Sequence, residues 1–80
     1  MLTFDDFSSR VIDTLQVDQP PAVTPYSDLY NELGLDSFQA FQLIVVIEAL
    51  AGAEVPPPDL PEMYTMGDAF RYYQRMASTP

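Results

Sequence analysis

The sequence of 80 residues contains no cysteine, no histidine, no tryptophan and no lysine. Without cysteine the chain can form neither a disulfide nor a thiolate metal site, so its stability must come from packing. Without histidine, lysine or cysteine, no side chain titrates near neutral pH unless its pKa is strongly shifted, and general acid–base chemistry therefore has no ready group. We predict that the protein is not an enzyme.

Basic residues are scarce as well, because three arginines stand against twelve acidic residues and give a net charge of -9. Three cations are too few to neutralise a nucleic-acid backbone, so nucleic acid is excluded as a partner. The acidic field favours basic protein partners instead. The acids are scattered without the spacing of a calcium loop, and no metal site is predicted.

Long hydrophobic segments are also missing. The longest apolar run, residues 43–51, is interrupted by Glu48 and is too short to span a membrane. No basic segment typical of a signal or transit peptide precedes Asp5. We therefore expect a monomeric, soluble protein of the cytoplasm that does not bind membranes.

Length and composition fit one globular domain, since 48% of the residues are hydrophobic. We expect this domain to cover residues 1–80, with its core over about 3–76 and a frayed tail at 77–80. Met1 directly precedes the first predicted helix, which favours a stand-alone protein over a piece of a longer chain.

The spacing of apolar residues predicts an all-α fold, a small bundle of three main helices with a short fourth as an option. The main helices are expected over residues 3–16, 37–51 and 65–73. Their N-cap residues are Thr3, Asp36 and Thr65, and Gly52 provides the stop signal of the second helix. A short helix is an option near Asp59 to Tyr64, although the prolines at 56–58 and 61 oppose it.

A long first loop joins the first two helices, because Pro20, Pro21 and Pro25 prevent a continuous helix. A single turn of helix is an option at 27–33. Loops of this length usually pack back on the domain. The side chains expected to do so are Tyr26, Leu29, Leu33 and Leu35.

The second predicted helix is apolar on two sides. At 100° per residue, one side forms the expected core face: Ala40, Leu43, Ile44, Ile47 and Leu50. Nearly opposite lies a second apolar stripe, formed by Phe38, Val45 and Ala49 with Phe41 at its margin. This stripe either docks partners or is covered by the rest of the fold or by a second copy of the chain.

Ser37 opens the second helix directly after the N-cap Asp36. Its hydroxyl is expected to face solvent beside the positive end of the helix dipole, where a phosphate ester would be stabilised. Asp-Ser is also a common pair for local capping alone, so the dipeptide does not by itself define a site.

Several segments in order resemble the acyl and peptidyl carrier proteins of fatty acid, polyketide and nonribosomal peptide synthesis. They are LGLDSF at 33–38, a long helix reaching Glu48, the pair Val55-Pro56, and PDLPEMYTMGDAFRYY at 58–73. The resemblance implies that Ser37 carries 4′-phosphopantetheine, delivered from coenzyme A by a phosphopantetheinyl transferase. It also implies that Asp36 helps this transferase to position its magnesium ion.

By the same resemblance, the arm holds an acyl or aminoacyl intermediate as a thioester and moves it between a loading enzyme and downstream synthase or transferase enzymes. The residues implied to contact these partners are Phe38, Phe41, Gln42, Val45 and Glu48. Fatty acid carriers usually place acids on this helix, where Gln39 and Gln42 stand here, so polyketide or nonribosomal biosynthesis is favoured. The alternative is an unmodified acidic helical adaptor that binds proteins through Phe38, Phe41 and Val45.

Overall fold

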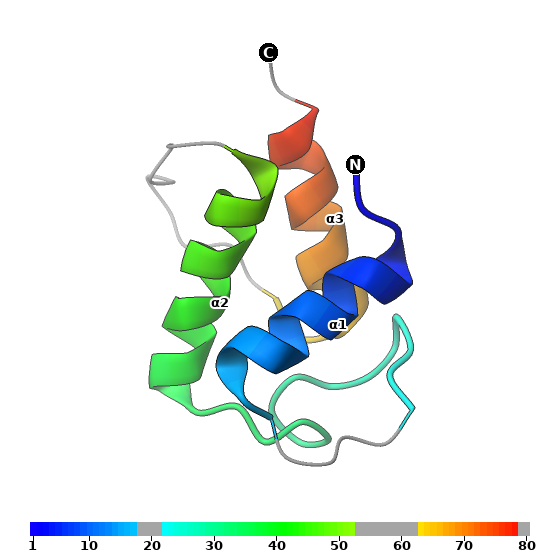
Figure 1. Cartoon of the computed structure of the whole chain (residues 1–80). Helices are drawn as coiled ribbons and strands as arrows, with labels where there is room; N and C mark the ends of the chain where they lie inside the picture. The colour runs from blue at the N-terminus through cyan, green and yellow to red at the C-terminus, as the bar shows by residue number, and fades with distance from the viewer. Residues whose placement is uncertain (18–21, 53–62, 79–80) are drawn as a thin grey trace.

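The computed structural model describes residues 1–17, 22–52 and 63–78. Within these ranges the chain forms three helices, α1 (Phe4–Leu15), α2 (Ser37–Ala51) and α3 (Met66–Ala77) (Figure 1). The same ranges contain no strand, only an isolated antiparallel bridge between Asp28 and Thr65. The prediction of a small all-α fold is confirmed.

The bounds of α2 are set by its end residues, as the sequence predicts. Asp36 and Gln39 form a reciprocal capping box: the Gln39 N–H donates to Asp36 Oδ1 at 2.8 Å, and the Asp36 N–H donates to Gln39 Oε1 at 3.2 Å. Gly52 ends the helix at φ 68, a left-handed conformation that glycine adopts without steric cost. In α1, Thr3 Oγ1 caps the N-terminus by accepting from the Asp6 N–H at 3.2 Å.

Helix α3 begins with the predicted capping box of Thr65 and Asp68 but extends one turn beyond the predicted end at Tyr73. Met76 and Ala77 pack against the core, and this burial stabilises the additional turn. The prediction that the chain frays from Ala77 onward is therefore wrong for Ala77 itself, which is the last helical residue. Residues 79–80 lie outside the described ranges.

Asp68 makes the stability of the start of α3 depend on pH. Its carboxylate accepts from the N–H of Tyr64 at 3.0 Å and from that of Thr65 at 3.2 Å, and these hydrogen bonds hold the pKa of Asp68 below its ordinary value. Because the pKa is depressed in the folded state, the stabilisation is present above the unfolded pKa of about 3.9 and is lost as the pH falls through the folded pKa.

At about pH 6 we expect the wild-type protein to have a larger free energy of unfolding than Asp68→Asn. At about pH 3 we expect this difference to be smaller. Urea unfolding of both proteins at the two pH values measures it. A difference that does not change with pH would show that the carboxylate charge does not contribute.

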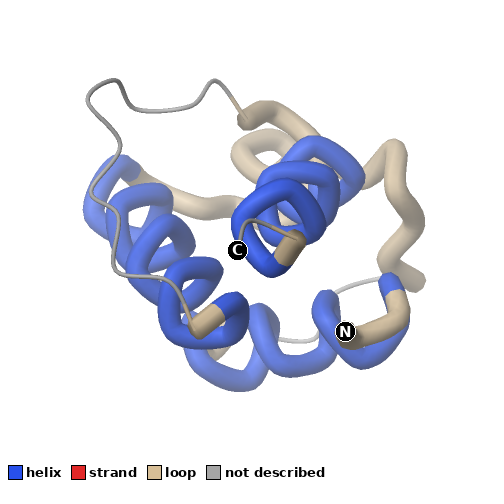
Figure 2. The backbone as a smooth tube through the Cα atoms, turned by 90° about the horizontal axis from the view of Figure 1, so that it is seen from above, coloured by secondary structure: helices blue, strands red, loops and turns tan. Residues whose placement is uncertain are grey.

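The core lies where the three helices meet, and each helix contacts the other two (Figure 2). Phe7 of α1 packs against Phe70 and Tyr73 of α3, with ring centroids 5.4 and 5.1 Å apart. α2 packs most extensively on α3. The buried hydrophobic side chains are Phe7, Val11, Leu15, Leu29, Leu33, Leu35, Leu43, Ile44, Ile47, Met63, Met66, Ala69 and Tyr73.

The first loop packs back on the helices through Leu29, Leu33 and Leu35, as predicted. Tyr26 does not, since it is 86% exposed. It lies at the tip of a turn closed by the Ser27 N–H donating to the Thr24 carbonyl at 3.0 Å, and this turn directs it into solvent.

The optional helix at 27–33 is not formed, because Asp28 organises turns there instead. Its Oδ1 accepts from the N–H groups of Tyr30 and Asn31, each at 2.8 Å. For the optional helix at 59–64, residues 59–62 lie outside the described ranges, while Met63 and Tyr64 are not helical.

Backbone hydrogen bonds join this loop to the start of α3. The Leu29 N–H donates to the Tyr64 carbonyl at 2.8 Å, the Met66 N–H to the Ser27 carbonyl at 3.0 Å, and the Gly67 N–H to the Pro25 carbonyl at 2.9 Å. The loop is thereby held beside α2, where Leu29 and Met63 form walls of the site described next.

Candidate functional site

Ser37 is the first residue of α2 and is exposed. The neighbouring Asp36 uses its carboxylate to cap the helix. Because it is the first residue of α2, Ser37 lies at the positive end of the helix dipole, which favours an attached phosphate.

Gln39 fixes this end of α2 to α1. Besides closing the capping box, its Nε2 donates to the carbonyl of Leu15, the last residue of α1, at 3.3 Å. A glutamate at this position would still close the capping box but would lack the donor for Leu15. The sequence did not reveal this contact, because it depends on the end of α1 meeting the start of α2.

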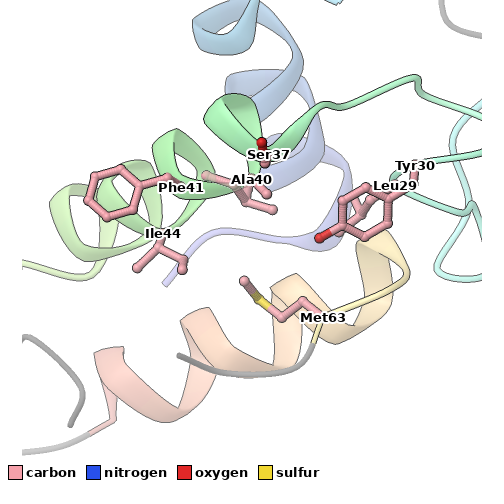
Figure 3. Close-up of a pocket in the computed structure, with 8 residues that line it drawn as sticks. Leu29, Tyr30, Ser37, Ala40, Phe41, Ile44 and Met63 are labelled. Atoms are coloured by element: carbon pink, nitrogen blue, oxygen red, sulfur yellow. The ribbon is translucent and has the colours of Figure 1, made fainter. Parts of the chain in front are cut away.

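A pocket of about 490 Å³ opens beside Ser37, between α2, the first loop and the segment that leads into α3 (Figure 3). Its lining residues are Leu29, Tyr30, Ser37, Ala40, Phe41, Leu43, Ile44 and Met63. In Figure 3 the Ser37 hydroxyl points away from Met63, so a group attached to it would begin outside the pocket. The lining is largely apolar and suits an aliphatic chain.

The two faces of α2 differ in burial as the helical periodicity predicts. Leu43, Ile44 and Ile47 are buried, while Ala40 and Leu50 of the predicted core face are half-buried. On the other side Phe38 is 67%, Phe41 58% and Val45 51% exposed, and Ala49 is exposed too. These four residues are called the exposed stripe below. Phe41 also lines the pocket.

The other two residues implied to contact partners, Gln42 and Glu48, are half-buried. Burial raises the pKa of the Tyr72 hydroxyl in α3, and the negative charge of Glu48 raises it further. Glu48 therefore lies close enough to α3 to interact with Tyr72.

Among residues 1–17, 22–52 and 63–78, no three histidine, cysteine, aspartate or glutamate side chains lie together as a metal site would require. None of the helices in this part of the chain has the length and apolar character needed to cross a membrane.

Comparison with known proteins identifies the family. A family model described as a phosphopantetheine attachment site matches residues 6–66, most of the chain. The chain belongs to the acyl carrier protein family. Acyl carrier proteins carry covalently attached 4′-phosphopantetheine, are not catalysts themselves, and interact with phosphopantetheinyl transferases and acyl-handling enzymes.

Relatives that carry this name come from several organisms. An acyl carrier protein of Helicobacter pylori is 30% identical over 92% of this chain and 94% of its own length. One from Wolinella succinogenes is 31% identical over 92% of this chain and 96% of its own. A protein of Schizosaccharomyces pombe, named as a mitochondrial acyl carrier protein, is 37% identical over 71% of this chain, and the match spans 51% of that relative.

No solved structure matches the chain. Because the relatives include bacterial proteins and one named as mitochondrial, the cytoplasmic location stays a prediction.

Proposed function

We propose that Ser37 is the residue to which 4′-phosphopantetheine is attached, and that Asp36 assists the transferase that attaches it. The exposure of Ser37 at the start of α2 carries this proposal, since the transferase must reach the hydroxyl. The helix dipole favours the resulting phosphodiester. When bound, the arm supplies the thiol that the chain itself lacks, while Ser37 and the N-terminus of α2 anchor and orient it.

Intact mass tests this proposal after incubation with coenzyme A, magnesium and a broad-specificity phosphopantetheinyl transferase. We expect wild type to gain the mass of one phosphopantetheine, and Ser37→Ala to gain none. Ser9→Ala is the matched control, because Ser9 is also an exposed helical serine and should not affect the gain. If several transferases leave the wild-type mass unchanged, the unmodified adaptor becomes the better description.

We further propose that the cargo is an acyl rather than an aminoacyl group. The pocket beside Ser37 supports this choice, because the walls formed by residues 22–52 and 63–78 are mainly aliphatic and provide no carboxylate to pair with a free amino group. We also propose that the protein acts in polyketide or related natural-product biosynthesis. This proposal rests on the uncharged start of α2, where Gln39 in the first turn and Gln42 in the second replace the acids usual in fatty acid carriers.

The exposed stripe is proposed to dock the partner enzymes, with Gln42 and Glu48 at its edge. Its side chains are apolar and open to solvent, and such residues are common anchors in protein interfaces. Because the stripe is uncharged, binding to it should depend only weakly on salt.

Truncating the exposed stripe should affect partners more than folding. We expect Phe41→Ala to leave the thermal midpoint nearly unchanged, because Phe41 is 58% exposed, while the transferase kcat/KM falls about tenfold through a lost interface anchor. Thermal unfolding and transferase kinetics measure the two effects. A large loss of stability with unchanged kinetics would make Phe41 a core residue and remove it from the docking surface.

A further inference from the structure

Tyr30 forms a wall of the pocket beside Ser37. Its backbone N–H is anchored by Asp28 Oδ1 at 2.8 Å, which fixes where the side chain leaves the loop. In Figure 3 the ring lies across the pocket from Phe41, and its hydroxyl is directed toward the space between Ile44 and Met63. Within the described ranges the hydroxyl makes no hydrogen bond to another residue.

This hydroxyl differs from the apolar groups that make up most of the pocket lining. Among the described lining residues, Ser37 and Tyr30 alone contribute polar side chains, and the Ser37 oxygen would be esterified in the proposed function. A plain alkyl chain that entered the pocket would displace water from the Tyr30 hydroxyl and leave it without a partner. A chain with a carbonyl oxygen at the same depth would accept its hydrogen bond.

We propose that the Tyr30 hydroxyl donates a hydrogen bond to a carbonyl oxygen of the chain tethered to Ser37, so that the pocket selects carbonyl-bearing chains over plain alkyl chains. This inference rests on the proposed attachment at Ser37. Two carbonyl groups could accept this hydrogen bond. One is an amide carbonyl of the pantetheine arm, and the other is a 3-oxo group of the acyl cargo. Tyr30 is a specificity residue in this account, and no bond is made or broken at it.

The test compares wild type, Tyr30→Phe and Tyr26→Phe, each loaded with a bare arm, a hexanoyl group or a 3-oxohexanoyl group. Tyr26→Phe is the matched control, because Tyr26 is 86% exposed and does not line the pocket. Intact mass first confirms loading of each protein. The readouts are the rate of thioester cleavage by hydroxylamine, which slows when the chain is sheltered, and the NMR shifts of the Met63 and Ile44 methyl groups.

If the carbonyl is the 3-oxo group, Tyr30→Phe accelerates cleavage of the 3-oxohexanoyl protein about fivefold, the factor expected for one hydrogen bond. Cleavage of the hexanoyl protein is not accelerated, because phenylalanine leaves no unpartnered hydroxyl beside an alkyl chain. If the carbonyl belongs to the pantetheine arm, Tyr30→Phe accelerates cleavage of both thioesters equally. It then also alters the methyl shifts when only the bare arm is attached. If wild type and Tyr30→Phe have equal cleavage rates for both thioesters and equal methyl shifts for all three loads, the inference is overturned. A failure of all three proteins to load would instead overturn the attachment at Ser37.

Discussion

Ile47→Ala is expected to lower the free energy of unfolding by about 2–5 kcal/mol, the usual cost of deleting a fully buried branched side chain. Ile47 is 0% exposed and lies on the core face of α2, the helix that packs most extensively on α3. A domain of this size has a total stability of only about 4–12 kcal/mol, so the substitution removes a large part of it. Urea or thermal unfolding measures the loss.

Val45→Ala is the matched control for Ile47→Ala. It also removes a β-branched side chain from α2, but Val45 is 51% exposed and belongs to the exposed stripe. We expect its effect to stay within about 0.5 kcal/mol of wild type. If the two substitutions cost the same, the core face of α2 is assigned to the wrong side of the helix.

Gly67→Ala should destabilise the protein even though alanine is the better helix former. A Cβ on Gly67 would lie 2.6 Å from the Pro25 carbonyl oxygen, which also accepts the Gly67 N–H at 2.9 Å. Helix propensity alone predicts a gain of up to about 1 kcal/mol at this position. Because the loop backbone would have to move, we expect a net loss of about 1–3 kcal/mol.

The sign of the Gly67→Ala effect decides the interpretation. Unfolding measurements give that sign, and hydrogen exchange at the amides of Leu29 and Met66 reports whether the contact between the loop and α3 has opened. A more stable variant with unchanged exchange would contradict the close approach of Pro25 to α3. It would also remove the constraint that holds Leu29 beside the pocket.

The bounds of α2 were predictable because local signals define both ends. Asp36 and Gln39 satisfy free backbone groups at the start, and Gly52 accepts the left-handed conformation at the end. The C-terminus of α3 carries no such signal. Its extension to Ala77 depends on Met76 and Ala77, which follow Tyr73 at three and four residues, continue the apolar stripe of the helix and pack against the core. The predicted end at Tyr73 omitted this last step of the pattern.

In the first loop, prediction succeeded for the leucines and failed for Tyr26. Leu29 and Leu33 are apolar throughout and gain only from burial. A tyrosine side chain can be buried or exposed, and the turn at Pro25 directs Tyr26 into solvent. The composition of a loop therefore indicates which side chains favour burial, while its turns determine which of them reach the core.

The site was predictable only in part, namely where its residues lie on a single helix. Ser37 and the exposed stripe lie on one helix, so helical periodicity places them relative to one another. The pocket, the bond from Gln39 to Leu15 and the orientation of Tyr30 each join segments that are distant in the sequence. These features depend on how the loop and α1 pack around α2, and the sequence pattern offers no signal for them.

The central claim is that Ser37 carries the phosphopantetheine arm in the living cell. The direct measurement is the intact mass of the chain isolated from its native host, followed by fragmentation to locate any added group. The account predicts one 4′-phosphopantetheine, bare or bearing an acyl group, on the fragment that contains Ser37. A native protein with unmodified Ser37 in every molecule, or with the group on another residue, would contradict it.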